Sequence, residues 1–236
     1  MKTIMKTSIL ALTLSFLTSA ALAVDSAQLD KRISMLTDKF EAFQHRDDGG
    51  IPADNLRQAK GIILLDTTKG GLVFGYQAGN GVAMVKNAVT RNWSPAAFLK
   101  ANEASFGAQI GGQENFYIIL LMTSNSTWRL IDPKIELGAA ASGTAGDTSA
   151  GVGTKTPSEP EILVYKDRTG LFGGAVVKGG SISADTEGNQ VYYGQNLSLR
   201  DILFDNKAQP TATVSTLVSK IRSYAHEPDV SASTKN

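Results

Sequence analysis

The chain repeats one pattern between residues 61 and 194: a short apolar run bounded by glycines, then another. Residues 61–66, 71–77 and 81–86 are the first three runs, and turns are expected at 69–70 and 79–80. Runs of this length separated by glycine predict strand, turn and strand, and such close turns favour antiparallel pairing. The pattern restricts the chain to a sheet-based fold and supplies few side chains capable of covalent chemistry.

Helical periodicity flanks the glycine-rich region on both sides. Apolar side chains recur every three or four residues within 26–44 and again within 211–224, so each segment is predicted to be an amphipathic helix. The first stripe consists of Leu29, Ile33, Leu36, Phe40 and Phe43. We therefore predict an α+β fold, with an antiparallel, barrel-like or strongly bent β-sheet core flanked by N- and C-terminal helices.

Shorter elements are predicted from local signals. Ser94 followed by Pro95 is typical of a helix start, which predicts a short helix at 94–99. Two more short helices are predicted at 52–60 and 198–204. Further strands are predicted at 104–111, 116–123, 127–131, 135–137, 162–166, 170–178, 181–184 and 190–193.

The first 23 residues have the pattern of a secretory signal peptide. Lys2 and Lys6 precede an apolar run at 8–17, and Ala21-Leu22-Ala23 resembles a signal peptidase site. A membrane anchor is the alternative, but the run is short for a bilayer span. A signal peptide on a chain without cysteine is typical of a bacterial periplasmic protein that has no disulfides. We therefore expect a periplasmic protein, with peripheral association with a membrane.

The rest of the chain is expected to form one domain at 24–226. It would include the N-terminal amphipathic helix at 24–50 and a flexible loop rich in Gly, Ala, Ser and Thr at 139–160, with a disordered tail at 227–236. Cleavage would remove two of 23 basic residues and none of 22 acidic residues, leaving a net charge of −1. This balance argues against nucleic-acid binding.

Residues suited to catalysis are scarce. His45 and His226 each lie just beyond a terminal helix, where a surface position is the simpler interpretation. Without cysteine or paired histidines, no metal site and no cofactor are expected. The glycines at 151–153 lack the lysine spacing of a phosphate-binding loop. We therefore expect a non-enzymatic protein, although a hydrolase using paired carboxylates stays open.

Several motifs occur in an order that resembles a known family. They are Ala59-Lys60-Gly61-Ile62, Gly70-Gly71, Gly79-Asn80-Gly81-Val82, Trp93-Ser94-Pro95, Gly107 to Gln113, Gly170 to Gly174 and Tyr192-Tyr193-Gly194. Together they resemble the SYLF domain, also called the Ysc84 actin-binding domain, over about residues 51–224. The resemblance implies lipid binding, and in an exported chain the ligand would be an anionic phospholipid at a membrane surface. Actin binding is not expected in that setting.

Basic and aromatic side chains are the candidates for lipid contact. Cations would hold a phosphate headgroup, while Phe40, Phe43 or Trp93 would insert at the interface. The candidate cations are Lys31, Arg32 and Lys39 on the first helix, then Arg57, Lys60, Lys86 and Arg91 near the first strands.

Other interpretations of these residues and of the protein stay open. The first helix could simply pack on the core, and Trp93 could be a packed residue. Arg57, Lys60 and Arg91 could be ordinary solvent-exposed residues at the ends of helices and strands, with no role in binding. An envelope structural or protein-interaction module is the main alternative function. An outer-membrane barrel is disfavoured by the predicted terminal helices.

Overall fold

The computed structural model describes residues 25–47, 49–70, 74–106, 113–132, 160–167, 170–172 and 181–228. The predicted signal peptide lies outside these residues, as do the 139–160 loop up to residue 159, the 135–137 strand and the tail from 229. Among the described residues, no helix is both long and apolar enough to cross a bilayer.

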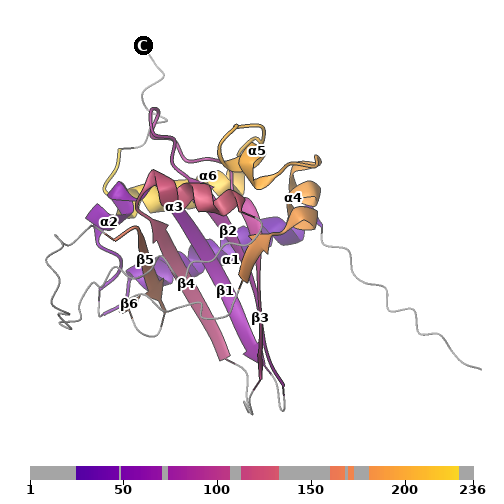
Figure 1. Ribbon diagram of the computed structural model, residues 1–236. Coiled ribbons are helices and arrows are strands. Elements are labelled where there is room, and N and C mark those ends of the chain that lie inside the picture. The colour runs from indigo at the N-terminus through magenta and orange to yellow at the C-terminus, as the bar shows by residue number, and fades with distance from the viewer. Residues whose placement is uncertain are drawn as a thin grey trace, which may run out of the picture.

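A seven-stranded antiparallel sheet forms the centre of the molecule, in the order β6-β5-β4-β1-β2-β3-β7 (Figure 1). In the part described, β6 and β7 form its two edges, so the sheet is open and does not close into a barrel. The α+β prediction is confirmed. The strands are β1 Gly61–Gly70, β2 Phe74–Val85, β3 Ala97–Phe106, β4 Gln113–Leu121, β5 Ile162–Lys166, β6 Gly170–Phe172 and β7 Ser181–Ala184.

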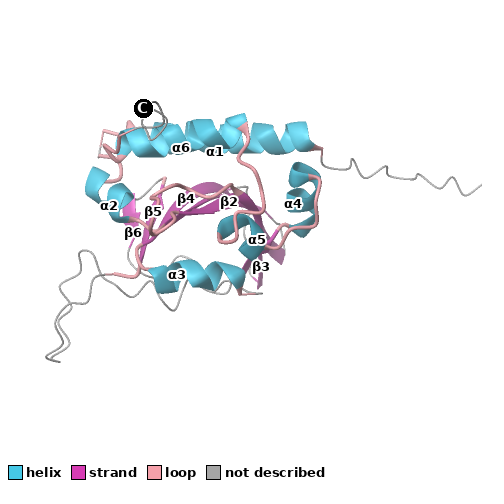
Figure 2. Ribbon diagram, turned by 90° about the horizontal axis from the view of Figure 1, so that it is seen from above, coloured by secondary structure: helices cyan, strands magenta, loops and turns pink. Residues whose placement is uncertain are grey.

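Helices cover both faces of the sheet (Figure 2). Helices α1 Ser26–Gln44, α2 Ala53–Gln58 and α6 Ala212–Tyr224 pack on one face. The opposite face carries α3 Ser124–Trp128, the 3-10 turn η1 Arg129–Ile131 and α5 Leu199–Leu203, while α4 Thr186–Tyr193 lies by the edge formed by β3 and β7. Two apolar clusters result, one on each side of the sheet.

Alternation along the central strands explains the two clusters. In β1, Ile62 and Leu64 belong to the α1 side, while Ile63 and Leu65 belong to the opposite side. Successive side chains of a strand point to opposite faces, and a strand buried on both faces has a continuous apolar sequence. The run Ile-Ile-Leu-Leu therefore identifies the fully covered half of β1.

The predicted turn at 79–80 is wrong, because both residues lie inside β2. Gly79 pairs with Thr67 of β1 and Ala101 of β3, so residues 74–85 form one strand instead of two. A Cβ atom at Gly79 would lie 2.7 Å from Thr67 Cγ2 and 2.9 Å from the Asp66 carbonyl oxygen. Here glycine allows close strand approach, and its presence does not indicate a turn.

Three other local predictions are also wrong. Residues 97–99 belong to β3, and Ser94 accepts a hydrogen bond from the Val85 N–H at 3.0 Å instead of capping a helix. Residues 127–131 are helical because Thr123 caps α3 in a capping box. Residues 190–193 belong to α4, whose N-cap Asp185 accepts from the Gly188 N–H at 2.9 Å. In the last two cases a polar side chain caps a helix in a segment whose apolar content had predicted a strand.

Candidate functional site

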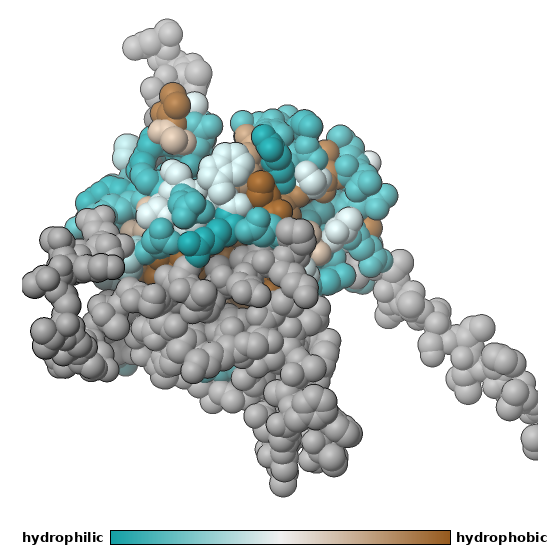
Figure 3. Space-filling model, in the orientation of Figure 1, coloured by the Kyte–Doolittle hydropathy of each residue, from teal (hydrophilic) through white to brown (hydrophobic). Residues whose placement is uncertain are grey.

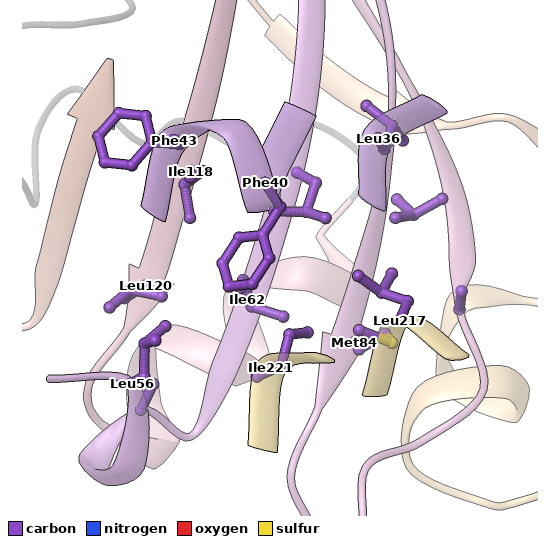
Figure 4. Close-up of a cluster of buried hydrophobic side chains, with 14 of the residues drawn as sticks. Leu36, Phe40, Phe43, Leu56, Ile62, Met84, Ile118, Leu120, Leu217 and Ile221 are labelled. Atoms are coloured by element: carbon purple, nitrogen blue, oxygen red, sulfur yellow. The ribbon is translucent and has the colours of Figure 1, made fainter. Parts of the chain in front are cut away.

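Helix α1 is a core helix. Phe40 is fully buried and packs edge-on against Tyr224 of α6, with ring centroids 5.8 Å apart. Figure 4 shows the Phe40 ring above Ile62 of the sheet, with Ile221 of α6 below them. Phe43 is 3% exposed and packs against Tyr165. The prediction that either phenylalanine inserts at a lipid interface is corrected, because neither can reach a membrane while α1 stays on the sheet.

The cations of α1 differ in their surroundings. Arg32 bonds Asp185 at 3.3 Å, and Lys39 bonds Asp66 at 2.6 Å. Lys31 is exposed and has no ion pair within the described part of the chain. The predicted cluster on this helix thus offers one unpaired cation.

Five other predicted residues meet at one end of the molecule. Arg57 lies in the last turn of helix α2, Lys60 precedes β1, and Lys86, Arg91 and Trp93 lie on the connection between β2 and β3. The backbone brings them together, since the Lys86 N–H donates to the Lys60 carbonyl at 2.8 Å and Lys86 pairs with Trp93 in an isolated bridge. We call Arg57, Lys60, Lys86, Arg91 and Trp93 the basic end.

The C-terminus of α2 helps to fix the cations. The Arg57 carbonyl accepts from Lys86 Nζ and from an Arg91 guanidinium N–H, each at 3.1 Å. Terminal helix carbonyls lack intrahelical partners and favour nearby cations. Arg91 has a left-handed backbone, with φ of 61°, in a tight loop closed by the Asn87 N–H to the Asn92 carbonyl.

A carboxylate that the sequence placed in the tail also belongs to this end. Glu227 Oε1 accepts from Lys86 Nζ at 2.9 Å and lies 3.5 Å from Arg91. Burial lowers the pKa of Lys86, and the hydrogen bond from Lys86 to Glu227 offsets part of that effect. The sequence around Glu227 does not indicate that it belongs to this site, because its partners lie more than a hundred residues earlier in the chain.

A cavity of about 580 Å³ opens at the basic end, and we call it the basic cavity. Arg57, Lys60 and Arg91 line it together with the apolar residues Met122 and Leu163. Arg57 pairs with Asp54 and Arg91 with Glu227, whereas Lys60 Nζ has no hydrogen bond or ion pair within the described residues. The basic cavity therefore combines apolar surface with an excess of positive charge.

Trp93 is joined to Lys86 by the β-bridge at the basic end. Its ring is half-buried, packs against the α1-side cluster, and lies 4.8 Å from Lys86 Nζ. This geometry agrees with the interpretation of Trp93 as a packed residue. Trp93 also lines a second cavity, of about 540 Å³, which shares Lys60 with the first. We call the second one the tryptophan cavity.

A third cavity, of about 380 Å³, brings three carboxylates together, as a carboxylate hydrolase would require. Asp66, Glu114 and Asp167 line it, with Lys39 and Arg46 among them. Lys39 Nζ donates a hydrogen bond to Asp66 Oδ2 at 2.6 Å. Asp66 could therefore serve as a general base only after this ion pair breaks. No group of acidic or histidine side chains among the described residues could hold a metal ion.

The open sheet, covered on both faces by helices and carrying a cationic end, defines the chain as an α+β domain. The chain belongs to the Ysc84 family: the family model described as "Las17-binding protein actin regulator" matches residues 102–224. This confirms the resemblance drawn from the glycine and tryptophan motifs.

Curated relatives support the same assignment. The chain is 27% identical over 180 residues to LAS seventeen-binding protein 3 of Saccharomyces cerevisiae, covering 74% of this chain and 39% of that protein. It is 24% identical over 186 residues to SH3 domain-containing YSC84-like protein 1 of Homo sapiens, covering 76% and 54%. The chain thus spans about two fifths to one half of these relatives. No solved structure matches it.

Proposed function

We propose that the mature chain is a non-enzymatic periplasmic protein that binds anionic phospholipid at a membrane surface through its basic end. The observation that carries this proposal is the basic cavity, where Arg57, Lys60 and Arg91 surround an apolar wall formed by Met122 and Leu163. A phospholipid headgroup combines a phosphate anion with adjoining hydrocarbon. The cavity offers partners for both parts.

Unequal charge supports the basic end as the membrane-facing surface. Four cations lie there against two carboxylates, Asp54 and Glu227. Charge-assisted hydrogen bonds from lysine and arginine to phosphate are short and strong. Each exposed cation near an anionic surface adds about 1 kcal/mol to binding. Lys60, Arg57 and Arg91 would then give weak docking that salt screens.

Vesicle co-sedimentation tests the proposal. Residues 24–236 would be mixed with vesicles of phosphatidylcholine alone or with phosphatidylglycerol, at low and at physiological salt. We expect sedimentation with the anionic vesicles, decreasing as salt rises, and little with the neutral ones. Equal binding to both vesicle types, or binding to neither, contradicts the proposal.

The description of the family and the names of its members favour a second candidate, a protein-interaction module. The family description names an actin regulator, and one relative is named for binding LAS seventeen. An actin filament co-sedimentation assay with the same protein tests this candidate. Filament binding without binding to anionic vesicles would replace the lipid proposal with the protein-interaction one.

A further inference from the structure

We propose that the tryptophan cavity binds a saccharide ring that carries a negatively charged group. The cavity is bounded by the β2–β3 connection, helix α3 and the segment that follows α5, and its volume is about 540 Å³. Small-molecule sites in proteins have volumes of about 300–1,000 Å³. The proposal goes beyond lipid binding, because such a ligand need not be part of a membrane.

An aromatic platform is the first feature of this cavity. Both tryptophans of the chain, Trp93 and Trp128, line it. Trp128 is 45% exposed and stacks on Phe204, with centroids 4.2 Å apart and planes 6° from parallel. Figure 3 shows apolar surface gathered between the positions of α3 and α5. The faces of sugar rings carry C–H groups that pack on indole, and a platform held in place reduces the ordering cost of binding.

Uncharged polar side chains surround the platform. The β2–β3 connection contributes Asn87 and Asn92, helix α3 contributes Ser124, and the segment after α5 contributes Asn206. Within the described residues, the Ser124 hydroxyl and the Asn206 amide make no hydrogen bond. Sugar hydroxyls donate and accept, as do amides and hydroxyls of the protein. Because sugar hydroxyls project all around the ring, polar groups on three segments suit a sugar better than a nucleobase.

The charge of the cavity indicates an anionic ligand. Lys60 and Lys86 are its charged lining residues, and no carboxylate lines it. The Lys86 ammonium already forms an ion pair with Glu227 at 2.9 Å, whereas the Lys60 ammonium has no partner within the described part of the chain. A phosphate or carboxylate on the sugar would therefore bond Lys60.

Titrations without lipid test this inference. Binding of glucose 6-phosphate would be measured by tryptophan fluorescence and by calorimetry, with glucose, inorganic phosphate and adenosine monophosphate as comparison ligands. We expect glucose 6-phosphate to bind at least about fivefold more tightly than any of the three. Equal affinity for inorganic phosphate would overturn the inference in favour of a simple anion site. Tighter binding of the nucleotide would overturn it in favour of base stacking.

Variants of the platform sharpen the test. Trp128→Ala should weaken glucose 6-phosphate binding by about fivefold or more, with Trp93 as the remaining fluorophore. Val89→Ala is the matched control, since Val89 is 91% exposed on the same connection as Asn87 and does not line the cavity. Ser124→Ala removes a hydroxyl of the polar surround and provides a second variant if Trp128→Ala fails to fold. Unchanged binding in the folded variant overturns the inference.

The result can be separated from the lipid proposal. Arg91→Gln lies in the basic cavity and outside the tryptophan cavity. Arg91→Gln should weaken vesicle binding and leave the affinity for glucose 6-phosphate within about twofold of the wild-type value. Trp128→Ala should weaken glucose 6-phosphate binding and leave vesicle binding within about twofold of the wild-type value. Loss of sugar binding in Arg91→Gln would contradict the assignment of two sites.

Discussion

Helix α1 carries the cations Lys31, Arg32 and Lys39, and the basic end carries Arg57, Lys60 and Arg91. On α1, the two cations nearest the sheet bond Asp185 and Asp66, and the apolar stripe of the helix is buried. At the basic end the cations line a cavity together with Met122 and Leu163. Each region has one cation without a partner among the described residues, Lys31 or Lys60. The comparison shows that an amphipathic pattern locates the core, whereas a binding site depends on cations that lie beside an apolar cavity.

The largest expected effect distinguishes core packing from lipid contact on α1. Phe40→Ala removes a fully buried ring between two helices and the sheet. Such truncations cost about 3–5 kcal/mol of unfolding free energy, which urea denaturation would measure. Leucine at this position should restore most of the loss. A folded Phe40→Ala protein with unchanged stability but weaker vesicle binding would contradict the core role of α1 and indicate that the helix contacts the membrane.

A second prediction concerns the ion pairs that attach α1 to the rest of the molecule. Asp185 accepts from the Gly188 N–H, bonds Lys100 at 2.9 Å, and bonds Arg32. Asp185→Asn should therefore cost about 2 kcal/mol at pH 7. Urea midpoints of the two proteins would measure this loss.

The pH dependence of the same variant gives an independent check. Burial raises the pKa of Asp185, but the hydrogen bonds from Lys100, Gly188 and Arg32 outweigh burial, so the net pKa lies below its ordinary value of 3.8. A lowered pKa stabilises the fold above the unfolded pKa, and this contribution is lost as pH falls. The difference between wild type and Asp185→Asn should therefore shrink between pH 5 and pH 3. A constant difference would contradict the assignment.

The smallest expected effects compare single cations of the two regions. Lys60→Gln should weaken anionic vesicle binding by about 1 kcal/mol, or roughly fivefold. Lys31→Gln is the control, because Lys31 is also unpaired among the described residues but lies on α1, where it is more exposed than the partly buried Lys60. Its effect should stay within twofold, and both variants should unfold near the wild-type midpoint. Equal losses of vesicle affinity in both variants would indicate that binding depends on the net charge of the protein and not on a specific site.

Much of the fold could be predicted from the sequence, because strong periodicity and clear caps act locally. The helix predicted at 26–44 and the strands at 162–166 and 181–184 have the observed bounds. The strand predicted at 190–193 failed because Asp185 caps a helix there, and its capping role depends on burial beside the sheet. Apolar content alone does not separate a short helix from a strand.

The candidate site was predictable only in part. Basic residues could be chosen from the sequence, but their partners lie far along the chain, as Asp185 does from Arg32 at 153 residues. Glu227 and the apolar wall of the basic cavity were missed for the same reason. Trp128 was missed because nothing around it in the sequence shows that it stacks on Phe204. Such long-range contacts decide which cations are free.

The most direct test compares two triple variants that each remove three positive charges. One is Arg57→Gln with Lys60→Gln and Arg91→Gln, and the other is Lys31→Gln with Arg32→Gln and Lys39→Gln. Both have the same net charge, so long-range attraction changes equally, and circular dichroism would verify that both are folded. Co-sedimentation with phosphatidylglycerol vesicles should be nearly abolished for the basic-end variant and largely kept by the α1 variant. The opposite order, or equal losses, would contradict binding through the basic end.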